Sequence, residues 1–424
     1  MAKIQVGKLN ISIKKRTLPQ FLMLYVFALP LLFSFLLDFL GVASIVKYTV
    51  DACWVLTVVL MLLNRKGNFS KDIVPIVSFI ALFFLYTLSV YAVNFQSIYY
   101  YLWGFRNNFR FYFAFLGFAM FFCEEDANAC LKLLDLVFWI NAIVSFVQYF
   151  YMGYSQDFLG GIFGVEKGCN AYSIIFFSVV ISKSILQFMS NREGILSCIA
   201  KCGVALLISA LAELKFFFIV FLVIILMSAF LTKFSLRKFV LLFFAAMLMI
   251  FASSVLSLIF GSGSELTLEN IFNLSTSSNY SGQDDLGRFS AISTISKTFL
   301  TDLKEQLFGM GLGNCDTSSF SICNTPFYRT YSDLHYTWLL SAFLFLETGY
   351  IGLIMYFLFF AFCFVFAAKN LKSENANHLF CKMAMIISVL CMLLVFYNAS
   401  LRSEAGYFAY FALALPFIKK QNQL

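Results

Sequence analysis

The chain has 424 residues, of which 61% are apolar and 12% are charged, and its mean hydropathy is +0.85. This composition excludes an ordinary soluble globular protein and predicts an all-α, polytopic membrane protein. The formal charge of +8 would suggest nucleic acid in a soluble protein, but in a membrane protein an excess of Lys and Arg on the cytoplasmic side explains it, so no nucleic-acid partner is predicted.

Apolar segments recur along the chain and approach the roughly 20 residues that a helix needs to cross a bilayer. They lack the alternation of apolar and polar residues that a transmembrane β-barrel would show. The first segment follows Lys14, Lys15 and Arg16 without a later small-residue cleavage site, so we expect a membrane helix and not a signal peptide. The twelve predicted spans are Leu18–Leu37, Ile45–Leu63, Ile73–Val93, Phe109–Cys123, Leu131–Tyr151, Ala171–Met189, Ile195–Leu211, Phe216–Leu231, Phe239–Phe260, Ile351–Ala368, Leu379–Tyr397 and Tyr407–Ile418.

The distribution of Lys and Arg predicts the orientation. An even number of spans places both termini on one side, and a cytoplasmic N-terminus puts 20 of the 30 Lys and Arg in or near the cytoplasm. Residues 1–260 then hold nine spans, 261–348 form a large extracytoplasmic loop, and 349–424 hold the last three spans. The cations on the other side are Lys47, Arg106, Arg110, Lys167, Lys215, Arg288, Lys297, Lys304, Arg329 and Arg402.

Several of these outer cations suggest a binding site for an anion. Arg106 and Arg110 are four residues apart and share one face if the segment is helical. Lys215 lies at the junction of two spans, and Arg402 lies at the outer mouth before the last span. Because topology does not require these charges, we expect an anion-binding cavity among them. The alternative for each is a long side chain that reaches the membrane interface.

The loop carries a helical period of its own. Its apolar residues step by three or four and predict one amphipathic helix, with Asp284 or Asp285 as the cap. Arg288 falls in the first turn, where the helix dipole disfavours a cation. It therefore needs an anionic partner, either one of the two aspartates or a ligand phosphate. The apolar positions are Leu286, Phe289, Ile292, Ile295, Phe299, Leu303 and Leu307.

A glycine-rich run, 308–314, follows this helix. It lacks the strand-turn-helix context of a dinucleotide fingerprint, so we expect a helix stop and close packing on the membrane helices, with no phosphate role. Cys315 and Cys323 follow it in the polar part of the loop. In an oxidising compartment they could form a disulfide, and two free thiols are the alternative.

His335 is one of only two histidines in the chain. We expect a second loop helix to begin near Ser332 or Asp333 and to run towards Glu347 and Gly349, with His335 in its first turn. A helix N-terminus favours neutral imidazole, the form that a general base needs. The alternative is a structural hydrogen bond.

Three absent patterns narrow the chemistry. The sequence shows no cluster of His, Cys, Asp and Glu with metal-ligand spacing, no nucleotide-binding motif and no arrangement typical of a Ser-His-Asp triad. No catalytic metal, nucleotide or other cofactor is therefore predicted.

Taken with the long outer loop, these motifs resemble the superfamily of bacterial O-antigen polymerases and O-antigen ligases. The residues that carry the resemblance are Gly287 and Arg288, the run 308–314, and His335 opening a helix that continues into 347–352. The sequence departs from the family in two places. Lys215 stands where members often have an arginine followed by small residues, and Tyr336 stands where an asparagine often follows the histidine.

The resemblance implies a GT-C-like membrane glycosyltransferase in the bacterial inner membrane, with cytoplasmic termini and its active site facing the periplasm. Its substrates would be undecaprenyl-pyrophosphate-linked glycans, and its partners membrane lipid and a separate chain-length regulator. His335 and Arg288 would be catalytic, and Lys215, Arg402, Arg106 and Arg110 would bind the diphosphate. A repeat-unit polymerase is the first reading. The alternatives are a ligase that transfers polymer to lipid A core and, from another class, a flippase.

Overall fold

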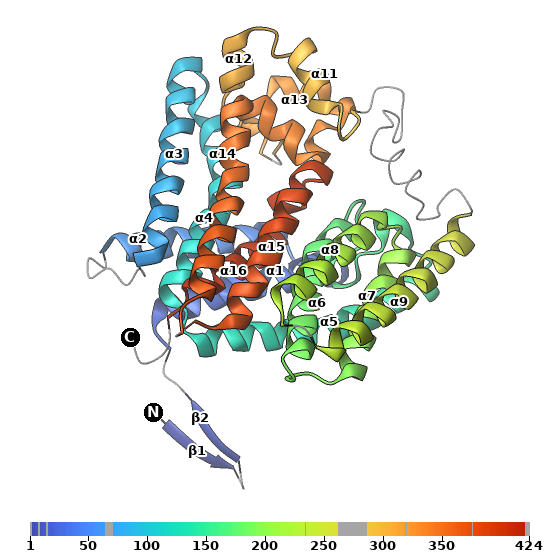
Figure 1. Ribbon diagram of the computed structural model, residues 1–424. Helices are drawn as coiled ribbons and strands as arrows, with labels where there is room; N and C mark the ends of the chain where they lie inside the picture. Colours follow the sequence, from blue (N-terminus) through green and yellow to red (C-terminus); the bar gives the residue numbers. More distant parts are fainter. Residues whose placement is uncertain are drawn as a thin grey trace.

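The computed structural model describes residues 2–6, 9–13, 16–63, 71–233, 235–261, 286–318, 320–374 and 376–419. The regular structure of these residues is almost entirely helical (Figure 1). A two-stranded antiparallel hairpin, β1 (Ala2–Val6) and β2 (Leu9–Ile13), precedes the first helix.

A helix is present at each predicted span, but not all of these helices have the length and composition of a span. Within the described residues, eight are long and apolar enough to cross a membrane: α1, α2 with the turn before it, α3, α5, α6, α9, α14 and α15. This agrees with a polytopic membrane protein, whereas the number twelve stays a prediction. The helices are α1 (Leu18–Leu40), α2 (Lys47–Leu63), α3 (Val74–Asn94), α4 (Ile98–Phe121), α5 (Glu124–Phe150), α6 (Asn170–Met189), α7 (Ile195–Leu211), α8 (Lys215–Leu231), α9 (Leu236–Phe260), α14 (Leu340–Leu371), α15 (His378–Tyr397) and α16 (Gly406–Ala414).

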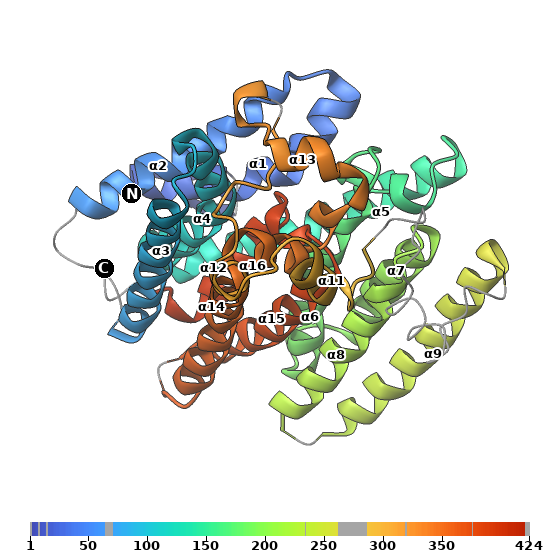
Figure 2. The same ribbon diagram turned by 90° about the horizontal axis from the view of Figure 1, so that it is seen from above.

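The core lies where α4, α14, α15 and α16 meet. Every residue of α16 is buried, as expected for a helix that is apolar on all sides. Tyr112 of α4 packs edge-on against Phe359 of α14 and Tyr410 of α16, with ring centroids 4.8 and 5.5 Å away. Seen from above, α14 to α16 lie between the group α1 to α4 and the group α6 to α9 (Figure 2).

The prediction of one amphipathic helix after Arg288 is wrong. Two short helices are present, α11 (Ala291–Thr298) and α12 (Leu303–Phe308), separated by a break. Asp302, in an extended conformation, is the N-cap residue of α12 and stands three residues before Glu305, a spacing typical of helix starts. Arg288 lies in a turn just before α11, and Asp284 and Asp285 fall outside the described residues.

The helix predicted from Ser332 through His335 is also wrong. Two short 3-10 turns, 332–334 and 336–338, stand there, and α14 begins only at Leu340. Between them His335 adopts the left-handed conformation, with φ 51° and ψ 25°. The helix was expected to run towards Gly349, and α14 has a break at this residue, where Gly349 has φ 61° and ψ −168°.

The described residues of 286–338 form a cap that contains α11, α12 and α13 (Pro326–Tyr331) and lies over one end of α14 (Figure 1). The glycine-rich run 308–314 packs closely against the backbone of α14, as predicted. The amides of Met310 and Gly311 donate to the carbonyls of Leu346 and Glu347, at 2.8 and 2.9 Å. A Cβ on Gly309 would lie 2.5 Å from this same backbone. Only glycine permits such an approach.

Candidate functional site

Arg106 lies on α4 at the side of α2. Its guanidinium donates to the carboxylate of Asp51 at 2.6 Å and lies over the rings of Tyr48 and Trp103, 5.1 and 5.2 Å from their centroids. Asp51 is one of the few acidic residues within an apolar span. Its position is explained by this pairing, because a carboxylate that is largely removed from water requires a charged or hydrogen-bonding partner.

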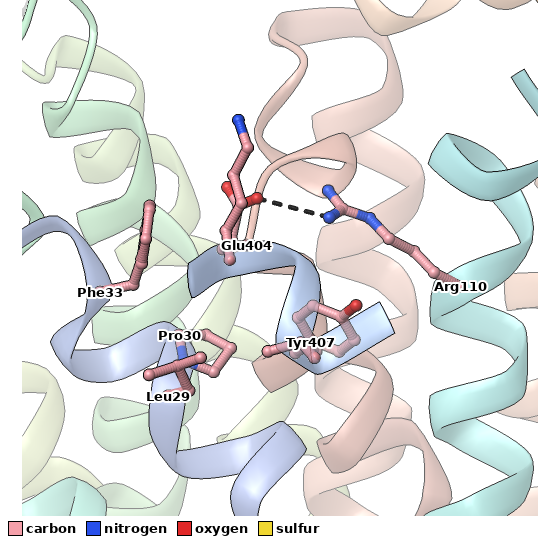
Figure 3. A pocket seen from close by; sticks show the side chains of 8 residues that line it. Leu29, Pro30, Phe33, Arg110, Glu404 and Tyr407 are labelled. Carbon is pink, nitrogen blue, oxygen red and sulfur yellow. Dashed lines mark hydrogen bonds and ion pairs between the residues drawn. The ribbon is translucent and has the colours of Figure 1, made fainter. Parts of the chain in front are cut away.

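Arg110 is one helical turn further along the same face of α4, as predicted, and is almost fully buried. It pairs with Glu404 at 3.4 Å (Figure 3). It also donates to the backbone carbonyl of Arg402 at 2.8 Å. The Tyr172 hydroxyl donates to Glu404 at 2.8 Å. Burial alone would raise the pKa of Glu404, but the Arg110 charge and the Tyr172 hydrogen bond lower it below its ordinary value.

Arg402 connects the membrane helices to the cap. Its guanidinium donates to Asp316 of the cap at 2.8 Å and lies 3.7 Å from the ring centroid of Phe343. The Asn107 amide donates to the same oxygen of Asp316 at 2.7 Å. Asp316 is only 4% exposed, so its charge is stabilised almost entirely by these protein groups.

The structure therefore brings the three arginines together in one arginine network, but each faces a carboxylate that sequence reasoning missed. The network contains Arg106, Arg110 and Arg402 together with Asp51, Asp316 and Glu404. Its formal charges balance. The pocket beside Arg110 and Glu404 has an interior of about 10 Å³, which is room for one water molecule. The geometry of the network is that of a bonded junction between the cap and the helices.

Arg288 lies against an aromatic pair whose other member, Phe216, directly follows Lys215 in the chain. The ring of Phe216 stacks on Tyr397, with centroids 3.8 Å apart and planes 7° apart. The Arg288 guanidinium lies 4.3 Å from the Tyr397 centroid, on the other face, and donates to the Tyr397 carbonyl at 3.1 Å. Lys215 pairs with Glu213 at 3.0 Å, and both side chains keep some exposure. The partners described here for these two cations, Tyr397 and Glu213, are not members of the arginine network.

His335 is on the segment next to the one that carries Arg288. The amide of Leu286 donates to the carbonyl of Leu334 at 3.4 Å, which joins the two segments. The imidazole stacks on Trp338 with centroids 3.9 Å apart, and the ammonium of Lys167 lies 5.1 Å from the same indole. Because no helix begins at His335, the helix dipole does not support its predicted role as a base. The proposal that His335 acts as a base therefore depends only on its place beside the segment that carries Arg288.

Cys315 and Cys323 are free thiols in the structure. Cys315 is fully buried with its sulfur 3.7 Å from that of Met310, whereas the Cys323 sulfur lies 4.0 Å from the Tyr99 carbonyl. Burial raises the pKa of both thiols. A raised pKa lowers the thiolate fraction and with it the reactivity towards disulfide exchange.

Metal ligands are not grouped in the part of the chain that the structure describes. No three residues among its His, Cys, Asp and Glu are placed to hold one ion. The two histidines lie in different regions, His335 in the cap and His378 at the start of α15, and so they cannot share a metal.

Comparison with known proteins adds no family to this description. No protein-family model matches the chain, and no curated protein sequence matches it. What the fold and the site define is a polytopic membrane protein with a cap bonded to its helices through a charge network.

Proposed function

We propose that the protein is a membrane glycosyltransferase that polymerises undecaprenyl-pyrophosphate-linked repeat units at the periplasmic face of a bacterial inner membrane. One observation supports this proposal most. The Leu286–Leu334 hydrogen bond sets the Arg288 and His335 segments side by side, where the cap meets the end of α15 and the start of α8. A cation and an imidazole at such a junction suit transfer from a lipid diphosphate.

The proposed reaction is a single displacement. The acceptor hydroxyl oxygen bonds to the anomeric carbon of the donor, and the bond from that carbon to the diphosphate oxygen breaks with inversion. The leaving diphosphate takes the electron pair, and the acceptor proton passes to His335. Arg288 and Lys215 stabilise the charge that develops on the leaving group. The diphosphate is already a good leaving group, so the proposal needs no bound nucleotide.

The arginine network has a different role in this proposal. Because Arg106, Arg110 and Arg402 belong to the network that joins the cap to the helices, we assign them to positioning the cap in place of the direct diphosphate contact that the resemblance implied. Lys215 also faces a carboxylate, Glu213, but this pair lies outside the network and Glu213 is partly exposed to water. Replacing a protein carboxylate by a phosphate would leave that carboxylate buried and unpaired, which is unfavourable.

Two other functions are alternatives to the polymerase, one within the same resemblance and one from another class. An O-antigen ligase would use the same donor and transfer finished polymer to lipid A core. A flippase would move lipid-linked glycan without chemistry. The polymerase is preferred because the family motifs are weakened here and polymerases are the more diverse group. A separate chain-length regulator would be its partner.

Deletion of the gene separates polymerase from ligase. We expect the deletion strain to display surface glycolipid that bears a single repeat unit, because attachment still occurs but extension does not. The measurement is the gel profile of surface polysaccharide, with a complemented strain as control. Loss of all surface repeat units, with long polymer retained on the undecaprenyl carrier, would instead indicate the ligase.

A further inference from the structure

A second cavity lies at the end of the helices opposite the cap. Its volume is about 590 Å³, within the range of small-molecule sites. It lies among the start of α5, the end of α6, the α8–α9 connection and the α14–α15 connection, which are at the lower end of Figure 1. Its lining residues are Glu124, Leu186, Met189, Ser190, Arg192, Thr232, Lys233, Ser235, Ala376, Asn377, His378, Leu379 and Lys382.

The charges of this cavity are unbalanced, unlike those of the arginine network. Arg192, Lys233 and Lys382 line it, against one carboxylate, Glu124. The Asn377 amide already donates to Glu124. Among the described residues, no carboxylate lies within ion-pair distance of any of the three cations. The cavity therefore has a surplus of positive charge available to a ligand.

Neighbouring cations at this end of the molecule show what a structural role looks like. Arg237 donates to the carbonyl of Phe188 at 3.0 Å, near the end of α6, and Lys238 donates to two carbonyls near the end of α8. Such bonds satisfy the last carbonyls of a helix. The three cavity cations make no such bond within the described part of the chain. Arg192 and Lys233 are exposed, as Lys372 is, but unlike Lys372 they line the cavity together with the half-buried Lys382.

The cavity wall is amphipathic. Leu186, Met189 and Leu379 contribute apolar side chains beside the three cations. A soluble anion would use only the charged part of this surface. A phospholipid would use both parts, its phosphate against the cations and the start of its acyl chains against the apolar residues. Basic pockets between membrane helices bind anionic head groups in this way.

We propose that this cavity binds the phosphate head group of an anionic phospholipid through Arg192, Lys233 and Lys382. This binding is independent of the proposed glycosyl transfer, since the cavity and the cap are at opposite ends of α14. Bound lipid would hold the α8–α9 and α14–α15 connections together at that end.

The test measures lipid retained by the full-length protein. Purified protein is equilibrated with phosphatidylglycerol and phosphatidylcholine in detergent, and bound lipid is counted by native mass spectrometry. The variant is Lys233→Gln with Lys382→Gln. The matched control is Lys132→Gln with Lys372→Gln, which removes two exposed lysines that do not line the cavity. We expect phosphatidylglycerol binding to weaken about thirtyfold in the cavity variant and to stay unchanged in the control.

A charge-conserving variant and a competition with inorganic phosphate complete the test. The variant Lys233→Arg with Lys382→Arg keeps the charge and should restore binding, which separates loss of charge from misfolding. Equal retention of phosphatidylglycerol by cavity variant and control would overturn the proposal. In a further arm, inorganic phosphate is added to the protein with bound phosphatidylglycerol. If phosphate displaces the lipid and the unfolding temperature of the protein stays unchanged, the ligand is a soluble phosphate and the proposal is overturned.

Discussion

Replacing His335 with glycine is expected to abolish polymer formation while leaving the protein folded. His335 has φ 51°, a conformation that costs an ordinary residue about 1–2 kcal/mol and costs glycine almost nothing. Glycine also loses the stacking contact with Trp338, so the two effects on stability largely offset each other. The imidazole is removed, and loss of a general base lowers a rate by about 10²- to 10⁴-fold.

Two measurements on this variant distinguish chemistry from backbone geometry. Turnover of lipid-linked repeat units reports the imidazole, and thermal unfolding in detergent reports the fold. His335→Asn is the control for shape, because asparagine accepts the left-handed conformation but cannot act as a base. His335→Asn should be as inactive as the glycine variant. For Arg288→Gln we expect the rate of turnover to fall about 10²- to 10³-fold. Polymer made at the wild-type rate by His335→Gly would exclude His335 from the reaction.

Replacing Asp316 with alanine is expected to destabilise the protein by about 3–5 kcal/mol, the loss typical of a broken buried ion pair. Arg402 would remain 12% exposed without its carboxylate, and the Asn107 amide would lose its acceptor. Because Asp316 bonds the cap to α4 and to the segment before α16, the cap should also become accessible to protease. Thermal unfolding and limited proteolysis measure the two effects.

The matched control is Lys369→Ala, which breaks the exposed Lys369–Asp72 pair, 65% and 37% exposed. An exposed pair contributes about 0–1 kcal/mol, so little change is expected. Asp316→Asn keeps the shape and removes the charge, and it should lie between the two. Unfolding of Asp316→Ala at the wild-type temperature would show that the network does not hold the cap.

The helices were predictable because their signal is local. A run of apolar residues bounded by charges is sufficient to place a helix such as α15 or the part of α14 that follows Gly349. Helices in the cap were predicted less well. The helical spacing of apolar residues from Leu286 to Leu307 continues across Asp302. Asp302 was not recognised as the N-cap residue at which a second helix begins.

The partners of the outer cations could not be predicted, because they are distant in sequence. Arg106 pairs with Asp51, 55 residues away, and Arg402 pairs with Asp316, 86 residues away. A signal did exist in the acidic residues of apolar surroundings, since a buried carboxylate requires a cation or several donors. The turn at His335 had no comparable signal, because left-handed backbone at a histidine depends on the packing around it.

The most direct test of the account is a reaction with the purified protein. Lipid-linked repeat units are added to the protein in detergent. Because detergent micelles enclose no separate compartment, a transporter would produce no detectable change in the repeat units. We predict chains of two or more repeat units together with release of undecaprenyl pyrophosphate, and neither product with His335→Gly. Repeat units recovered unchanged from correctly folded wild-type protein would contradict the proposed glycosyl transfer.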